Sequence, residues 1–205
     1  MKKLLNSADQ YALETVEGLA AAFPQFYRLH PKSWRVVHRP DAARPGRVGI
    51  VSGGGSGHLP VFTGYVGRGL LNACAIGEVF ASPPANDMAL AIRASDGGAG
   101  VLRLYGNYGG DIMNFDMAGE LVEADGIETT TVLVADDVAS APATEREKRR
   151  GVAGMVYAFK IAGAAADAGH DLAEVTRVTQ QACDAMRSIG VALSPCIVPQ
   201  AGKPS

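Results

Sequence analysis

The sequence lacks the features of a membrane protein and of a small secreted domain held together by disulfides. It contains no run of about 18 apolar residues, and the two lysines near its start are followed by polar residues instead of a signal-peptide core. Cysteine is rare, and Cys74, Cys183 and Cys196 form no Cys-x-x-Cys pair. We therefore expect buried free thiols and a cytoplasmic protein that does not associate with membranes.

An excess of charge of one sign is also missing. The net charge is -2, so the composition predicts no basic surface for nucleic acid. A hydrophobic content of 47% with 20% charged residues is typical of an ordered globular protein, and 205 residues are enough for one large α/β domain. No internal repeat or low-complexity linker divides the chain.

What the sequence does contain is a glycine-rich loop behind a short buried strand. Residues 48–51 are apolar and partly β-branched, and four glycines occupy the six positions 52–57, directly before His58. The loop lacks the lysine of a P-loop, the spacing of a dinucleotide fingerprint and the Gly-x-Ser-x-Gly pattern of a hydrolase. A plain turn with a surface histidine is the simpler alternative. The three serial glycines favour a substrate-binding loop.

Short β-branched segments alternate with helical patterns along the chain. This alternation predicts an α/β fold with a largely parallel sheet and helices on both faces. Strands are expected at 34–38, 48–51, 71–76, 101–105 and 129–134, with extended backbone at 190–198. Helices are expected after a capping box at Ser7, over 61–70 behind Pro60, from an N-cap at Ser82 to 95, and over 112–125, 153–168 and 172–187, with Gly169 and Asp171 between the last two.

A second glycine-rich loop follows the strand at 101–105 and ends at Asp111. Because the carboxyl ends of parallel strands meet at one edge of a sheet, we expect His58 and Asp111 to face one crevice. An imidazole can accept a proton from a hydroxyl at neutral pH, and a nearby carboxylate stabilises the resulting cation. The alternative for Asp111 is an N-cap on the following helix. A metal site at Asp136 and Asp137 is less favoured, because adjacent strand residues point to opposite faces.

Several segments together resemble one known family. The chain is similar to the substrate-binding subunit of dihydroxyacetone kinases, including relatives that phosphorylate four-carbon ketoses such as erythrulose. The matching segments are 52–58 (SGGGSGH), 77–83 (GEVFASP), 107–115 (NYGGDIMNF), 136–139 (DDVA), 149–153 (RRGVA) and 202–205 (GKPS). Their number and order make the resemblance specific.

The resemblance implies a phosphotransferase that acts on a small ketose such as dihydroxyacetone (glycerone). In the family the ketose binds in a water-poor pocket, and its terminal hydroxyl receives a phosphoryl group. Transferred to this sequence, the substrate-binding residues are Gly55, Ser56, Gly57, His58, Gly106 and Asp111. His58 would accept the proton of the hydroxyl, and Asp111 would orient the same hydroxyl.

The resemblance also implies partners. ATP or ADP with Mg²⁺ would be carried by a separate helical subunit or domain, which agrees with the missing P-loop, and this chain would bind no cofactor or metal itself. Positioning and charge neutralisation dominate phosphoryl transfer, so such a division of labour is chemically reasonable. The full-length protein is expected to be a homodimer.

The sequence departs from the family pattern at two points. Dihydroxyacetone kinases carry a substrate-contacting lysine at the position of Gly106, and glycine there predicts open volume beside Asp111 and a preference for a larger ketose such as erythrulose. The family's second histidine, which binds the substrate carbonyl covalently, belongs to a C-terminal half, and His30, His38 and His170 do not lie in that motif. We therefore expect residues 1–205 to be a ketose-binding domain truncated before that half, inactive as a kinase by itself and with an exposed apolar edge.

Two other functions compete with a ketose kinase. Relatives of this subunit can act as partners of transcription factors, so a non-catalytic sugar-sensing or regulatory module is the main alternative. A hydrolase built on the glycine loop is disfavoured, because the loop offers neither a nucleophile elbow nor an oriented Ser-His pair.

Overall fold

A single six-stranded sheet organises the chain. The computed structural model describes residues 4–201, and its strands are β1 (Arg28–His30), β2 (Ser33–His38), β3 (Gly49–Gly55), β4 (Ala73–Gly77), β5 (Val101–Gly106) and β6 (Thr129–Val134). Their order is β1-β2-β4-β3-β5-β6. β3, β4, β5 and β6 are parallel, while β1 and β2 add an antiparallel edge. The prediction of a largely parallel α/β sheet is confirmed.

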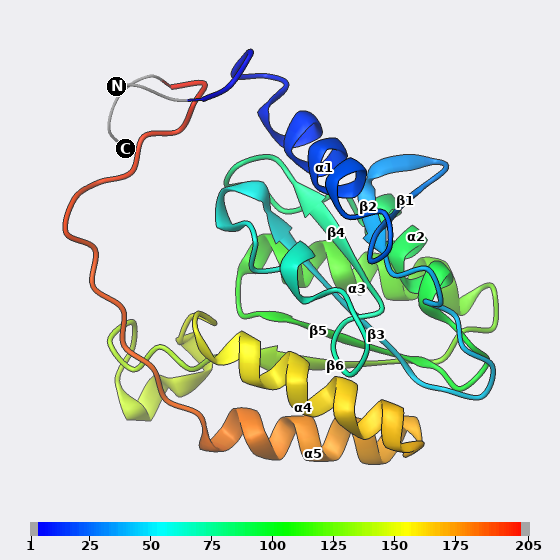
Figure 1. Ribbon diagram of the computed structural model, residues 1–205. Coiled ribbons are helices and arrows are strands. Elements are labelled where there is room, and N and C mark those ends of the chain that lie inside the picture. Colours follow the sequence, from blue (N-terminus) through cyan, green and yellow to red (C-terminus); the bar gives the residue numbers. More distant parts are fainter. Residues whose placement is uncertain (1–3, 202–205) are drawn as a thin grey trace.

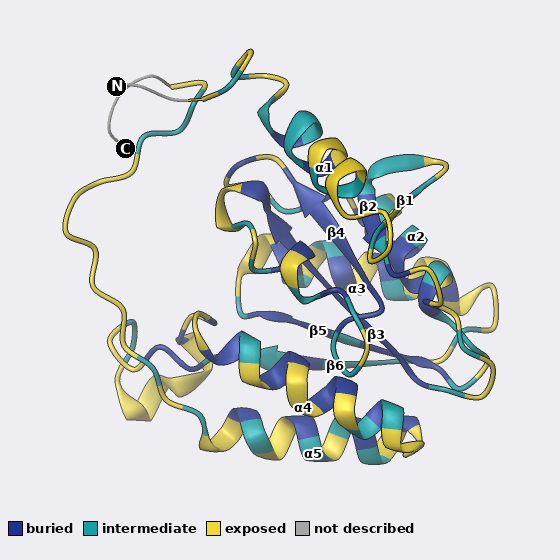
Figure 2. Cartoon of the chain, viewed as in Figure 1, coloured by how far each residue is buried: buried dark blue, intermediate teal, exposed yellow. Residues whose placement is uncertain are grey.

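Helices cover both faces of the sheet (Figure 1). The helices are α1 (Tyr11–Ala22), α2 (Ala85–Ser95), α3 (Gly109–Glu123), α4 (Gly154–Ala168) and α5 (Leu172–Ala185). Neighbouring strand residues point to opposite faces: Ile50 packs in the core under α1, α4 and α5, whereas Val51 packs in the core under α2 and α3. Figure 2 shows the central strands β3, β4 and β5 buried between these two layers, as expected for a parallel sheet.

Several boundaries agree closely with the sequence patterns. β6 covers the predicted residues, and Gly169 ends α4 in the left-handed conformation with φ 90°. The side chain of Asp171 caps α5 by accepting a hydrogen bond from the amide of Glu174 at 2.8 Å. Cys74 and Cys183 are buried as predicted, but Cys196 is exposed.

The predicted helix at 61–70 is wrong. The segment forms tight turns, with a short 3₁₀ helix at Thr63–Tyr65, and Gly69 takes a φ of 67° that a regular helix does not allow. The next strand begins at Ala73 instead of residue 71. Asn72 interrupts the ladder there, since its side chain accepts from the amide of Ile50 and donates to the carbonyl of Ala42.

Other predicted elements are shifted or absent. α2 begins at Ala85, with Pro84 in the N-cap position, so Ser82 is not its cap. The backbone at 190–198 pairs with no strand of the sheet as described, and it leaves Val191 and Leu193 exposed. No helix within residues 4–201 is long and apolar enough to cross a membrane. The family-like segment 202–205 lies outside the described residues.

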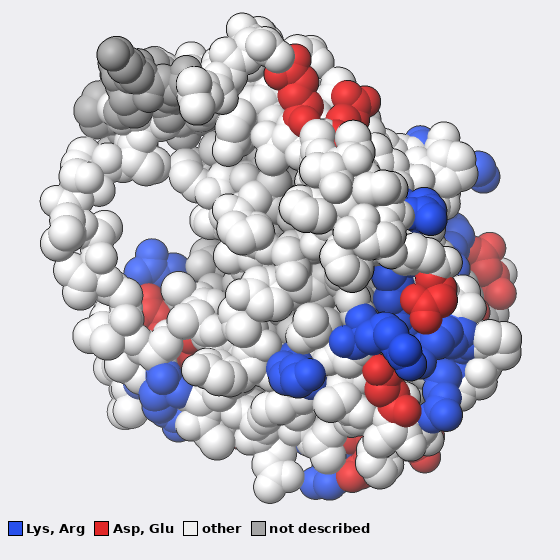
Figure 3. All heavy atoms as spheres, in the orientation of Figure 1, with Lys and Arg blue, Asp and Glu red and all other residues white. Residues whose placement is uncertain are grey.

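Charge is unevenly distributed on the face shown in Figure 3. Charged side chains are sparse over the carboxyl ends of the parallel strands, whereas Lys and Arg gather near their amino ends, with Asp and Glu among them.

Candidate functional site

The candidate site opens between β3 and β5. β3 pairs with β4 from Val51 to Gly55, but it pairs with β5 only from Gly49 to Val51. Beyond Val51 the two strands separate at their carboxyl ends. In the sheet order, β4 and β5 lie on opposite sides of β3, and such a switch point is where open α/β sheets bind ligands.

The glycine-rich loop is packed against the segment that follows β4. A Cβ on Gly55 would lie 2.7 Å from the carbonyl oxygen of Val79, and one on Gly57 would lie 2.5 Å from the same oxygen. The amides of Ser56 and Gly57 donate to the carbonyls of Glu78 and Val79 at 3.0 and 2.6 Å. None of the glycines in this loop has a positive φ. The glycines are therefore required for close backbone approach.

His58 ends the 3₁₀ turn Ser56–His58 at the rim of this loop. Its ring lies beside Phe80, with ring centroids 5.4 Å apart. Partial burial lowers the pKa of His58 below the usual 6.5, because a less polar environment disfavours the imidazolium ion. The imidazole is thus neutral at physiological pH and can accept a proton.

Asp111 lies in the first turn of α3, at its third residue. Its carboxylate is buried, with 9% of the residue exposed, and Oδ1 has no hydrogen-bond partner in the part of the chain that the structure describes. Burial raises the pKa of Asp111, and a hydrogen bond with Ser82 acts in the opposite direction. The alternative role of N-cap is wrong, because Tyr108 occupies that position and α3 begins at Gly109.

One cavity of about 300 Å³ brings these residues together. Its walls include both predicted catalytic residues, the loop glycines 53–55, Gly106 and several apolar side chains: Gly53, Gly54, Gly55, His58, Val61, Phe62, Phe80, Ala81, Ser82, Gly106, Tyr108, Gly110, Asp111, Gly151, Val152 and Met155. The expectation that His58 and Asp111 face one crevice is confirmed. Ser56 and Gly57 are not among the lining residues, so their contact with a substrate stays a prediction.

Sequence reasoning missed the far wall of the cavity. This wall is lined by Gly151, Val152 and Met155. No binding role was predicted for the family-like segment 149–153 or for the helix expected at 153–168. The predicted open volume at Gly106 is also wrong. A Cβ at Gly106 would lie 2.9 Å from the ring of Tyr108 and 3.3 Å from the sulfur of Met155, so neighbouring side chains already fill that space.

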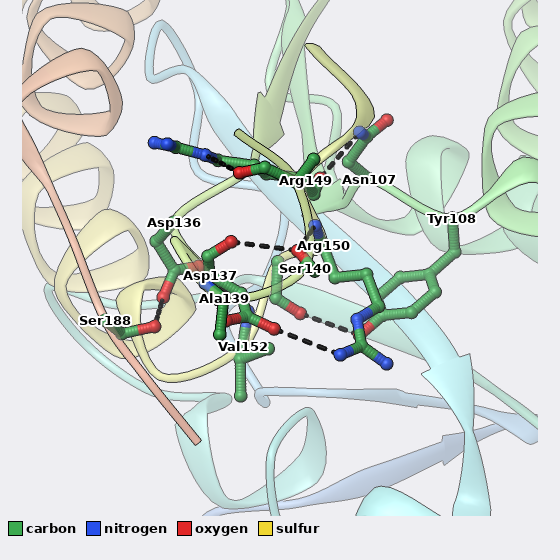
Figure 4. A network of polar contacts seen from close by, with 12 residues as sticks. Asn107, Tyr108, Asp136, Asp137, Ala139, Ser140, Arg149, Arg150, Val152 and Ser188 are labelled. Carbon is green, nitrogen blue, oxygen red and sulfur yellow. Dashed lines mark hydrogen bonds and ion pairs between the residues drawn. The ribbon is translucent and has the colours of Figure 1, made fainter. Parts of the chain in front are cut away.

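Asp136 holds this wall in place (Figure 4). It is fully buried, and its carboxylate accepts hydrogen bonds from the amides of Val152 and Gly154, both at 2.8 Å, and from the hydroxyl of Ser188. Asp137 pairs with Arg150 at 3.2 Å. The Asp136 carboxylate therefore anchors the backbone of residues 152–154, while the Asp137 carboxylate accepts from the side chain of Arg150 and the amide of Ala139. These hydrogen bonds satisfy both buried carboxylates.

The lining residues do not fit a nucleotide with magnesium. The cavity's lining includes no Lys or Arg to neutralise phosphates, and residues 4–201 contain no group of three or more His, Cys, Asp or Glu side chains placed to hold a metal ion. A small uncharged ligand with hydroxyl groups fits better, because it could donate to Asp111 and His58 and lie against the apolar wall.

Comparison with known proteins gives several extensive matches. The family model described as the Dak1 domain matches residues 17–205. The dihydroxyacetone-binding subunit DhaK of the PTS-dependent dihydroxyacetone kinase 1 of Listeria innocua is 47% identical, over 100% of this chain and 61% of that protein. The L-erythrulose kinase of Pectobacterium atrosepticum is 45% identical, over 100% of this chain and 34% of that protein.

Solved structures share the fold. The dihydroxyacetone kinase of C. freundii matches with a TM-score of 0.90 and 36% identity, over 97% of this chain and 36% of that one. Its complex with AMP-PNP and Mg²⁺ matches with a TM-score of 0.87 and 35% identity, over 95% and 36% of the two chains. The dihydroxyacetone kinase operon co-activator Dha-DhaQ matches with a TM-score of 0.73 and 31% identity, over 82% and 51%.

The matched region accounts for most of this chain but only part of its relatives. This chain spans 61% of the Listeria subunit and 34% of the Pectobacterium kinase. The family model nevertheless covers far more than half of the 205 residues, including every element that forms the cavity. The chain therefore belongs to the Dak1 domain family.

Proposed function

We propose that this chain is the ketose-binding part of a kinase that phosphorylates the terminal hydroxyl of dihydroxyacetone or of a related small ketose such as erythrulose. The observation that carries this proposal is the buried, unpartnered Oδ1 of Asp111 in the same cavity as the neutral imidazole of His58. The names of the Listeria and Pectobacterium relatives support the choice of substrate class.

The chemistry assigned to this chain is to bind, orient and deprotonate the hydroxyl. Asp111 accepts a hydrogen bond from the hydroxyl and fixes its direction, and His58 accepts its proton while the oxygen forms its bond to phosphorus. The backbone of residues 53–55 contacts the rest of the sugar, and the apolar wall limits access of water. Ser56, Gly57 and Gly106 remain proposed members of the binding loops.

The phosphoryl donor is proposed to be held elsewhere. The C. freundii kinase was solved with AMP-PNP and Mg²⁺, and the Listeria relative is called a subunit, both of which support a nucleotide-carrying partner subunit or domain. We also propose a cytoplasmic location and a homodimer for the full-length protein.

A sugar-sensing role is the second candidate, favoured by the match to an operon co-activator. Both candidates require ketose binding, so the first test is calorimetric titration of the protein with dihydroxyacetone and L-erythrulose, with glycerol as the control without a carbonyl group. The second test adds a nucleotide-binding partner subunit, ATP and Mg²⁺ to the full-length protein. Sugar phosphate formation supports the kinase, binding without phosphorylation supports the sensor, and no binding of either ketose contradicts both.

Asp111→Asn is expected to weaken ketose binding without destabilising the fold at neutral pH. Hydrogen bonds to charged groups contribute about 1.5–3 kcal/mol, so the affinity should fall roughly 10- to 100-fold. Because burial raises the folded-state pKa of Asp111, its contribution to stability is greatest below the unfolded pKa of about 4 and is lost as the pH rises through the folded pKa.

Asparagine does not ionise, so the stability of the variant does not decrease as the pH rises through the pKa of Asp111. Thermal melts at pH 4 and pH 7 should show the Tm of the variant, relative to wild type, rising with pH. A variant whose Tm falls at pH 7 together with its affinity would show that Asp111 has a structural role instead.

The pH dependence of turnover should reflect the lowered pKa of His58. A proton acceptor must be neutral, and burial favours the neutral imidazole, so the acid limb of kcat/KM is expected below pH 6.5. The measurement is the initial rate of ketose phosphorylation at subsaturating ketose between pH 5 and 8, with partner and nucleotide in excess. An acid limb centred at or above pH 6.5 would contradict the assignment.

A further inference from the structure

The ring of Tyr108 occupies the space beside Gly106. The hypothetical Cβ of Gly106 would lie 2.9 Å from Cε2 and 3.1 Å from Cδ2 of this ring. The backbone holds the two residues together, because the amide of Tyr108 donates to the carbonyl of Gly106 at 2.8 Å. Both residues line the cavity together with Asp111. Tyr108 therefore limits the cavity on the side of β5.

The hydroxyl of Tyr108 reaches across to the opposite wall. It donates a hydrogen bond to the carbonyl of Gly151 at 3.0 Å, and Figure 4 shows the side chain extended toward that segment. Gly151 is itself pressed against the ends of two strands: a Cβ there would meet the carbonyl oxygen of Val134 and would lie 2.8 Å from the Cα of Gly106. Neither glycine can accept a side chain without moving its neighbours.

Tyr108 thus joins two parts of the site that are far apart in the sequence. Its ring lies on the N-terminal side of α3, and its hydroxyl holds the segment that Asp136 anchors from the other side. Since 38% of the residue is exposed, Tyr108 borders both the cavity and the solvent.

We propose that Tyr108 is the specificity-determining residue of this site: its ring sets the length of the ketose that fits beside Asp111, and its hydroxyl keeps the wall at Gly151 closed. This inference rests on the proposed function. A four-carbon ketose has one more hydroxyl-bearing carbon than dihydroxyacetone. The ring of Tyr108 fills the space beside Gly106 in which that carbon would have to lie.

The ring and the hydroxyl make separable contributions. Tyr108→Ala removes the ring and should raise the affinity for L-erythrulose relative to dihydroxyacetone by about 10-fold or more, as expected for one carbon unit in a fitted pocket. Tyr108→Phe keeps the ring and removes only the hydrogen bond to Gly151. It should lower the affinities for both ketoses to a similar extent and leave the ratio of the two affinities within about 2-fold of that of wild type.

The test is calorimetric titration of the full-length protein with both ketoses, in wild type and in the two Tyr108 variants. Tyr157→Ala is the matched control, since Tyr157 is exposed on α4 and does not line the cavity. Circular dichroism melts establish that each variant is folded, and Tyr108→Phe still tests the hydroxyl if the alanine variant is unstable.

The outcomes separate this inference from the proposed function. A changed ketose ratio in Tyr108→Ala, with unchanged ratios in Tyr108→Phe and Tyr157→Ala, supports the inference. Ketose binding by wild type with the same ratio in Tyr108→Ala overturns the inference but leaves the proposed function intact. Failure of wild type to bind either ketose overturns both.

Discussion

His58→Ala is expected to lower the rate of ketose phosphorylation by about 10²–10⁴-fold, the usual effect of removing a general base. The loss should appear in kcat more than in KM, because proton transfer occurs in the transition state whereas Asp111 and the glycine loop continue to bind the sugar. Initial rates over a range of ketose concentrations, with a nucleotide-loaded partner subunit in excess, provide the measurement.

The fold should tolerate this change. His58 lies at the rim of the cavity and is only partly withdrawn from solvent, and the course of the loop is determined by the contacts of Gly55 and Gly57 with Val79, so the Tm is expected to stay within about 2 °C of wild type. His170→Ala is the matched control, because this exposed histidine follows α4 and lies outside the cavity. If His58→Ala kept most of its activity while His170→Ala behaved as wild type, the proton would have another acceptor.

Asp136→Ala is expected to produce the largest loss of stability. It removes the acceptor for the amides of Val152 and Gly154, and each buried donor left without a partner costs about 1–3 kcal/mol, so the free energy of unfolding should fall by roughly 2–6 kcal/mol. The same change frees the wall at Gly151 and Val152, so ketose affinity should fall as well. Urea unfolding followed by circular dichroism measures the first effect.

Asp184→Ala provides the contrast. Asp184 forms an ion pair with Arg146 at 3.0 Å, but both side chains are more than half exposed, so its loss should cost at most about 1 kcal/mol. Ser188→Ala should give an intermediate loss, because it removes one of the hydrogen bonds to Asp136. Equal effects of Asp136→Ala and Asp184→Ala would show that Asp136 does not anchor the wall.

Local patterns were sufficient to predict the parts of the fold that depend on local physics. The β-branched run at 129–134 forms β6, and Gly169 and Asp171 end and begin the two C-terminal helices. The shared crevice of His58 and Asp111 was predictable too, since it needs only the rule that parallel strands end at one edge. The helix at 61–70 failed because packing of that segment and the conformation of Gly69 outweighed the helical signal of Pro60.

The far wall could not be predicted because it depends on contacts distant in sequence. The hydrogen bond from Tyr108 to Gly151 joins residues 43 positions apart, and the one from Val152 to Asp136 crosses a loop of irregular backbone. For the same reason Gly106 was misinterpreted: an absent side chain predicts open space only when no other side chain fills it. The composition of residues 149–155, with two glycines among seven residues, did not by itself indicate a binding wall.

Substitution of the glycines in the glycine-rich loop is limited by the volume of the new side chain and not by the backbone torsion angles. Its glycines have ordinary negative or extended φ angles, so asparagine or aspartate, which often replace glycine in left-handed turns, gain no advantage here. A Cβ would instead meet the carbonyl of Ala75 at Gly53, the ring of Phe62 at Gly54, and the carbonyl of Val79 at Gly55 and Gly57. Only glycine therefore fits at these positions, and the reason is steric. Any larger residue would require β4 and the turn that follows it to move.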